Sequence, residues 1–161
     1  MTMTMMKKNK TAYKMGISKK MLKRLRKTQK KQQNNKRNCM VVHKFLELLN
    51  MVKLYHWKTH SFSQHKATDE LHGKLSENID RFVEVLMGKS KQRIQMLDAK
   101  MRLYDLDTKQ ELREHMLEYR DFLINLDQVF HPRRDSDLFS IRDDLLADMN
   151  QFLYLWTFDQ P

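Results

Sequence analysis

The sequence predicts an all-α protein: a four-helix bundle with a long crossover between its second and third helices, preceded by a disordered basic tail. Sheet proteins use Gly and Pro for their many turns, and this chain has only 3 Gly and 2 Pro in 161 residues. Beyond residue 38, apolar residues recur at the three- and four-residue spacing of amphipathic helices. Residues 1–38 contain 14 Lys or Arg and no acidic residue, whereas residues 39–161 contain 17 basic and 20 acidic residues. We therefore expect a tail over residues 1–38 and a helical body over residues 39–161.

The composition also excludes several classes of protein. The single cysteine, Cys39, excludes a disulfide framework and a cysteine-rich zinc site, and it suits a reducing compartment. No stretch approaches the 18 consecutive apolar residues of a membrane span, and the start of the chain lacks the apolar core of a secretory signal. We expect an intracellular protein that has no membrane partner. Cytoplasmic, nucleic-acid-associated, nuclear and virion locations all remain open.

The tail has too few apolar residues to order itself, although Lys19 to Lys31 could become helical against a polyanion. Its dense basic residues can neutralise phosphates, which predicts salt-sensitive binding to DNA or RNA without sequence preference. The candidate nucleic-acid-binding residues are Lys7, Lys8, Lys19, Lys20, Lys23, Arg24, Arg26, Lys27, Lys30, Lys31, Lys36 and Arg37. A nuclear address and an organelle presequence are the alternative interpretations.

The body begins with two helices joined by a short turn. The first covers residues 39–59, and a capping box of the form S-x-x-Q at Ser61 to Gln64 opens the second. The second helix extends to Met87, and Gly88 supplies its stop. Their inward residues are Val42, Phe45, Leu46, Leu49, Val52 and Tyr55 in the first helix and Leu71, Leu75, Ile79, Phe82, Val83 and Leu86 in the second.

A long connection over residues 89–107 follows, with a short helix expected around residues 94–103. The third helix covers residues 109–129, and Ser140 and Asp143 are candidate caps of the fourth. Their inward residues are Leu112, Met116, Tyr119, Leu123 and Leu126 in the third helix and Leu145, Met149, Phe152, Leu153 and Trp156 in the fourth. Two short turns and one long crossover are the connectivity of ferritin-like bundles, and on pattern alone an ordinary four-helix bundle fits equally well.

The second helix carries two pairs of metal-ligating residues. His65 and Asp69 lie four residues apart and share one helix face, and Asp80 and Glu84 repeat that spacing. Asp69 and Asp80 are separated by only ~20° around the helix but by ~16 Å along it. One metal ion therefore cannot touch both pairs in one chain. Two copies of this helix, antiparallel about a twofold axis, would bring each pair against the other pair of its partner and form two equivalent sites.

The same residues form the pattern His-x₃-Asp-x₁₀-Asp-x₃-Glu, and the pair His56-Trp57 precedes it late in the first helix. This combination resembles the miniferritins, or Dps proteins (DNA-binding proteins from starved cells). The resemblance is close over residues 56–84 and extends elsewhere only to the layout of the helices. The segment between His56 and His65 is shorter than is usual in that family and lacks its customary glycine.

The resemblance implies a ferritin-like fold and a ferroxidase centre at a twofold interface, where Fe(II) is oxidised by peroxide or oxygen and stored. It assigns His56, His65 and Asp69 to one subunit and Asp80 and Glu84 to its mate. Carboxylate and imidazole ligands suit iron, with manganese or zinc as alternatives. The family also implies a homo-oligomer that extends to a cage, protection against oxidative stress, and lysine-rich tails that bind DNA.

Other interpretations of these residues stay open. Charged residues on a helix usually form a solvated face, so the chain could be a non-enzymatic nucleic-acid packaging protein without a functional metal site. A bundle that binds a partner protein through its acidic face is a third option. His56 could be a core or interface histidine that donates to a carbonyl, and His72 either a spare ligand or a surface residue. No Glu-x-x-His occurs, which argues against a di-iron centre inside one bundle.

Overall fold

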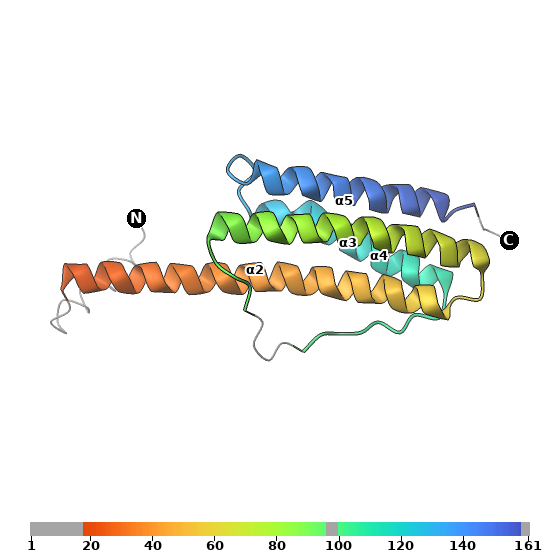
Figure 1. Cartoon of the computed structure of the whole chain (residues 1–161), viewed down its shortest axis with the longest axis horizontal. Helices are drawn as coiled ribbons and strands as arrows, with labels where there is room; N and C mark the ends of the chain where they lie inside the picture. The colour runs from red at the N-terminus through yellow and green to blue at the C-terminus, as the bar shows by residue number, and fades with distance from the viewer. Residues whose placement is uncertain (1–17, 96–99, 159–161) are drawn as a thin grey trace. The chain divides into compact units, whose positions relative to one another are not determined.

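The computed structural model describes residues 18–95 and 100–158. Their helices are α2 (Lys19–Lys58), α3 (Phe62–Ser90), α4 (Lys109–Ile124), the 3-10 helix η1 (Asn125–Gln128) and α5 (Ser136–Leu155) (Figure 1). No strand occurs in the described ranges, which confirms the all-α prediction. None of the helices there has the length and apolarity needed to cross a bilayer. The chain divides into two compact units, Met1–Arg37 and Asn38–Pro161, which we describe separately.

The core of the second unit lies between α2, α3, α4 and α5, as predicted for a four-helix bundle. At its centre the Phe45 ring meets the Phe82 ring edge-on, with 5.1 Å between centroids, and lies 5.9 Å from Phe122. The predicted inward residues are buried except Leu46, Leu49, Val83 and Leu153, which are partly buried and pack against the core. Burial of each large apolar side chain stabilises the fold by about 1.5–3 kcal/mol.

Ion pairs at the two ends of the bundle establish the direction of each helix. At the end of α2, Lys58 Nζ lies 2.6 Å from Asp105 Oδ1 and 2.5 Å from Asp107 Oδ1, just before α4 begins. At the end of α3, Lys89 Nζ lies 2.6 Å from Asp137 Oδ1 in the first turn of α5. Helix α4 therefore starts at the end of the bundle where α3 starts, and the two run in the same direction. Figure 1 shows residues 100–108, which precede α4, running along the bundle.

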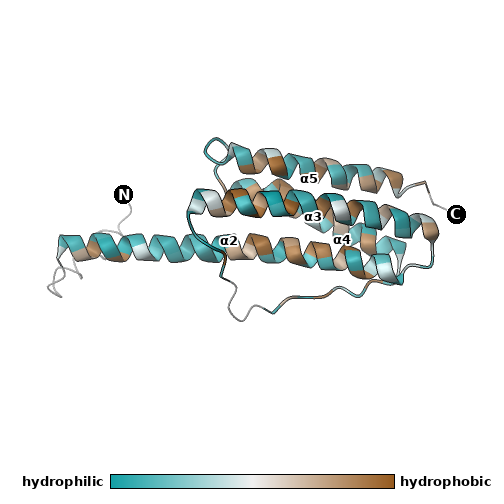
Figure 2. Cartoon of the chain, viewed as in Figure 1, coloured by the Kyte–Doolittle hydropathy of each residue, from teal (hydrophilic) through white to brown (hydrophobic). Residues whose placement is uncertain are grey.

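Helix α2 begins twenty residues earlier than predicted, at Lys19 instead of Cys39. The expectation that residues 19–38 are disordered was therefore wrong. No Gly or Pro interrupts residues 19–58, and Lys, Arg, Gln, Leu and Met are good helix formers even without an apolar stripe. The Ser18 hydroxyl also accepts a hydrogen bond from the backbone N–H of Met21 at 3.2 Å. Figure 2 shows that residues 19–37 are mostly hydrophilic.

The start of α3 at Ser61 is confirmed, whereas its end and half of its capping box differ from the prediction. The helix continues through Gly88, and it ends where Lys91 adopts a left-handed conformation with φ 52°. At the start, Ser61 Oγ accepts from the Gln64 N–H at 3.4 Å, which is half of the predicted capping box. The other half is absent because the Gln64 side chain accepts instead from the Tyr55 hydroxyl at 2.7 Å. This bond ties the start of α3 to the end of α2.

The crossover and the end of the third helix also need correction. The described residues near 94–103 contain no helix, and residues 96–99 lie outside the described ranges. Helix α4 ends at Ile124 instead of residue 129. The side chain of Asn125 donates to the Asp121 carbonyl at 2.8 Å, and this polar cap ends the α-helix before one turn of 3-10 helix.

Helix α5 begins earlier than predicted, so Ser140 and Asp143 lie inside it and do not cap it. Pro132 precedes α5, and no Gly or Pro lies between it and the end of the helix at Leu155. Asp137 lies in the first turn of α5. A carboxylate there is favoured by the partial positive charge of the helix N-terminus. The helix can therefore start at Ser136 although the side chain of its N-cap residue, Asp135, accepts no hydrogen bond from the first turn.

Candidate functional site

His56 and His65 lie against each other where α2 turns into α3. Their rings are stacked, with 3.9 Å between centroids and 25° between planes. His56 Nδ1 is 3.0 Å from the carbonyl oxygen of His65, and His65 Nδ1 is 2.9 Å from the carbonyl oxygen of His56. The short turn between the two histidines therefore brings them together, and the two imidazoles bind each other's backbone.

These two hydrogen bonds determine which nitrogen carries the proton in each neutral ring. A carbonyl oxygen can only accept, so both Nδ1 atoms must be donors. In neutral histidine the Nε2 atom then keeps its lone pair. Metal-binding histidines commonly have this arrangement, in which one ring nitrogen donates to a carbonyl and the other is available as ligand. The hydrogen bond from His56 to a carbonyl was considered above as a sign of a core histidine. A metal-binding histidine needs the same hydrogen bond, so this bond fits both interpretations.

Buried groups hold His56 in place. Its side chain is only 7% exposed. The Thr68 hydroxyl, which is fully buried, lies 3.4 Å from His56 Nδ1 and donates to the Gln64 carbonyl at 2.7 Å. Sequence reasoning missed Thr68, although its place four residues after Gln64 on the core side of α3 is a signal that could have found it.

Asp69 extends this group toward solvent. Its Oδ1 atom lies 3.7 Å from His56 Nε2 and 3.6 Å from Lys53 Nζ, and its side chain is 55% exposed. With the proton on Nδ1, His56 Nε2 and Asp69 Oδ1 both present lone pairs, and the Lys53 ammonium offsets the charge of the carboxylate. Two ligands about 2.1 Å from one tetrahedral ion are about 3.4 Å apart, close to the separation seen here.

His72, one turn beyond Asp69, is partly buried beside the same group. Burial lowers the pKa of its imidazole, the charge of Lys53 lowers it further, and the charge of Asp69 opposes both. His72 therefore favours its neutral form. It is neither a fully exposed surface residue nor part of the stacked pair.

The second predicted pair, Asp80 and Glu84, lies farther along the uninterrupted helix α3, and both residues are exposed. The structure does not bring them to His65 and Asp69 within one chain, as the ~16 Å rise between Asp69 and Asp80 requires. Among the residues that the structure describes, no three His, Cys, Asp or Glu side chains are arranged to hold a metal ion. Any shared site thus needs a second chain.

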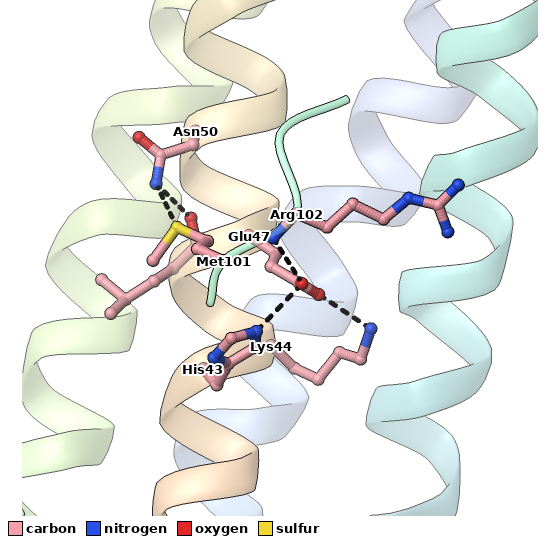
Figure 3. A network of polar contacts seen from close by, with 7 residues as sticks. His43, Lys44, Glu47, Asn50, Met101 and Arg102 are labelled. Atoms are coloured by element: carbon pink, nitrogen blue, oxygen red, sulfur yellow. Dashed lines mark hydrogen bonds and ion pairs between the residues drawn. The ribbon is translucent and has the colours of Figure 1, made fainter. Parts of the chain in front are cut away.

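A buried carboxylate that sequence reasoning missed lies elsewhere, at Glu47 (Figure 3). Its side chain is 5% exposed and accepts from His43 Nε2 at 3.0 Å, Lys44 Nζ at 2.8 Å and the Arg102 backbone N–H at 3.2 Å. Burial acts to raise the pKa of Glu47, but the hydrogen bonds from Lys44, Arg102 and His43 outweigh it, and the pKa lies below its ordinary value. The signal was a glutamate inside the apolar stripe Phe45 to Leu48.

The basic helix of the first unit has its charges on one side. At 100° per residue, nine of its ten Lys and Arg fall within about 160° of the helix circumference. Lys36 falls on the opposite side, together with Met21 and Leu25, whose side chains are exposed. From Lys19 to Arg37 the basic face is about 27 Å long. Two other candidates, Lys7 and Lys8, lie outside the described residues.

With this fold and these sites described, comparison with known proteins adds one classification. The chain belongs to a family of unknown function (DUF5856), which matches it over residues 56–156. The match starts at His56 and covers α3, α4 and α5. No curated protein and no solved structure matches the chain.

Proposed function

We propose that two copies of this chain bind Fe(II) between their α3 helices, oxidise it with peroxide or oxygen, and retain the ferric product, as miniferritins do. The observation that carries this proposal is the reciprocal bonding of His56 and His65, which leaves both Nε2 atoms as acceptors, with His56 Nε2 3.7 Å from Asp69 Oδ1. The connectivity supports it, because two antiparallel helix pairs joined by a long crossover are typical of ferritin-like bundles.

The spacing on α3 supports a twofold arrangement. The midpoint between His65 and Glu84 falls between Lys74 and Leu75, and the midpoint between Asp69 and Asp80 falls at the same place. An antiparallel copy related by a twofold axis at that point would place each residue opposite its counterpart. Each dimer would then have two equivalent sites, with His56, His65 and Asp69 from one chain and Asp80 and Glu84 from the other.

In this assembly the protein fixes the ligands and leaves positions open for the oxidant. Neutral imidazole and carboxylate oxygen suit iron, and manganese or zinc are alternatives. His65 and Asp69 hold an iron ion, His56 completes that side, and Glu84 of the second chain bridges. Two Fe(II) ions give one electron each to hydrogen peroxide, which takes up two protons and forms two waters.

The test is an anaerobic Fe(II) titration of the full chain, followed by peroxide, with ferric absorbance recorded per chain. The double variant Asp80→Ala/Glu84→Ala is expected to lose rapid oxidation and keep its helix content. The matched control Glu70→Ala/Glu77→Ala removes the same charge from the same helix and is expected to oxidise iron at the rate of the unmodified chain. Unchanged kinetics in the first variant would refute the proposed centre.

A second candidate function, non-specific binding of DNA or RNA, is favoured by the one-sided basic face of residues 19–37. A helix with its Lys and Arg on one side can neutralise a row of phosphates without contacting bases. If this were the only function, the chain would package nucleic acid and take up no stoichiometric iron. Together with iron oxidation, it would shield the bound nucleic acid from peroxide.

A further inference from the structure

We infer that the chain pairs with a second copy through the outer face of α3, with Phe62 of each chain inserted into a pocket of its partner beside Met87 and Gly88. This inference rests on the proposed function, because it uses the same twofold arrangement. It adds an apolar contact between Phe62 and Met87 that holds the two helices in register.

The first observation is an apolar side chain without cover. Phe62, the first residue of α3, is 76% exposed. Its ring contacts the ammonium of Lys66, with Nζ 5.9 Å from the ring centroid. A large aromatic side chain at this exposure loses the stability that its burial would provide, so a contact that covers it is favoured.

The second observation is a pocket of about 440 Å³ at the other end of the same helix. Its lining residues are Glu84, Met87, Gly88, Lys91, Gln92 and Arg93. A Cβ atom added at Gly88 would meet no atom within 4 Å, so the space beside this glycine is open. The pocket thus offers the Met87 side chain and the open space beside Gly88 to an incoming aromatic ring, and its lining also includes Lys91 and Arg93, cations that an aromatic face attracts.

The third observation joins the first two. The midpoint between Phe62 and Met87 lies between Lys74 and Leu75, the point shared by the two pairs of candidate ligands. At 100° per residue, one face of α3, about 60° wide, carries both Phe62 and Met87. The same face carries the candidate acidic ligands Asp69, Asp80 and Glu84. One antiparallel arrangement therefore pairs the ligands and, without further adjustment, places each Phe62 opposite the partner's pocket.

The helix is also shaped for close approach at this midpoint. Gly73 and Ser76 face each other there in the twofold arrangement, and a Cβ atom at Gly73 would meet no atom of its own chain within 4 Å. Small residues at a crossing let two axes come close. Phe62 lies about 19 Å from the crossing, where axes inclined by about 20° diverge by about 6 Å, within reach of a phenylalanine ring.

The charged residues on the outer face of α3 favour a second copy as the partner and make pairing depend on a metal ion. Lys66 of one chain lies next to Glu84 of the other, which is favourable. Asp69 of one chain faces Asp80 of the other, and two opposed carboxylates repel unless a cation or a proton lies between them. Pairing should therefore tighten when a divalent metal ion is added, and loosen when it is chelated.

Chemical cross-linking tests this register. In a Cys39→Ser background, which has no other thiol, Ser76→Cys is treated with a short bis-maleimide. This variant keeps Phe62 and Met87, and the proposed arrangement places residue 76 of the two chains about 4.5 Å apart along the paired helices. A covalent dimer is the expected product. The control Arg81→Cys, whose two copies would lie about 20 Å apart along the helices, should stay monomeric. A monomer from Ser76→Cys, or a dimer from both variants, overturns the inference.

Sedimentation equilibrium of the full chain provides the second measurement. Phe62→Ala is expected to weaken self-association more than tenfold, whereas Phe158→Ala, which removes another exposed phenylalanine, should not change it. Equal association of both variants, or an unmodified chain that is monomeric with and without Mn²⁺, overturns the inference. Cross-linking by a chain that does not oxidise Fe(II) would refute the iron function alone. Iron oxidation without cross-linking would refute the docking alone.

Discussion

The carboxylate of Glu47 and the backbone N–H of Arg102, 55 residues apart in the sequence, lie at a hydrogen-bond distance of 3.2 Å. The bond fastens the crossover to α2, and Asn50 adds a second attachment through its contact with Met101 Sδ at 3.1 Å (Figure 3). The long connection is thus held along the bundle by a buried charge.

Substitution of Glu47 by Gln should destabilise the fold by about 1–3 kcal/mol, because the change removes the charge that His43 and Lys44 surround. It should also speed tryptic cleavage after Arg102, because the crossover loses part of its attachment. Urea unfolding and limited proteolysis measure the two effects. Glu118→Gln is the control, since the Glu118 side chain, which pairs with His115, is 68% exposed and a change of less than about 0.5 kcal/mol is expected there. Equal effects of the two substitutions would contradict this role of Glu47.

The same carboxylate predicts a pH dependence of stability. Its pKa in the folded chain lies below its ordinary value of 4.5, so its contribution is fully present above that value. The contribution is lost as the pH falls through the lower, folded pKa. The difference in free energy of unfolding between the unmodified chain and Glu47→Gln should therefore shrink as the pH falls from 4.5 through the lower pKa of the folded chain. A difference that stays constant over this range would show that the charge of Glu47 is not the cause.

His65→Ala should abolish rapid oxidation of Fe(II), because it removes one ligand and one of the two bonds that hold the imidazoles. The loss of that bond should also lower the free energy of unfolding by about 1 kcal/mol. His60→Ala removes an exposed histidine from the neighbouring turn and should change neither quantity. Stopped-flow absorbance and thermal unfolding of both variants provide the measurements, and undiminished oxidation by His65→Ala would argue against its role as ligand.

Gly73→Leu should prevent pairing of two chains, since a leucine at the crossing holds the α3 helices apart. Within one chain the added side chain meets open space, and leucine is the better helix former by roughly 0.5–1 kcal/mol. The variant should therefore be at least as stable as the unmodified chain at a concentration where both are monomers. Gly73→Ala is small enough to keep the pairing. Analytical ultracentrifugation compares the two, and a fully associated leucine variant would exclude this crossing point.

Lys30→Gln should reduce the slope of log K against log salt for duplex DNA by about 0.9, because Lys30 lies on the basic face of α2. Lys36→Gln removes the same charge from the opposite side and should leave the slope unchanged. Fluorescence anisotropy with two unrelated duplex sequences also tests the absence of sequence preference. Equal slopes for the two variants would show that the one-sided arrangement plays no part in binding.

The sequence predicted the bundle well because its apolar residues recur at helical spacing. Leu112, Met116, Tyr119 and Leu123 are all buried where the pattern placed them. The ends of the helices were predicted less well. Gly88 was expected to stop α3, but the helix passes through it, since a glycine on an exposed face costs only about 1 kcal/mol.

The candidate site was predictable in part. The spacing of His65, Asp69, Asp80 and Glu84 is a property of one helix, so the sequence contains it. The stacking of His56 on His65 depends on how the turn between α2 and α3 folds, which no periodicity reveals. Glu47 was missed for a related reason: its partner in the crossover lies too far along the chain for any local pattern to indicate it.

The two tryptophans of the chain differ sharply in exposure. Trp57, directly after His56, is 68% exposed, whereas Trp156 is 4% exposed and lies 5.9 Å from the Tyr55 ring. Their fluorescence should therefore separate into a red-shifted component near the histidines and a blue-shifted one from the interior. A paramagnetic ion captured beside His56 would quench the first and spare the second, so ion capture and unfolding can be followed in one sample without an added label.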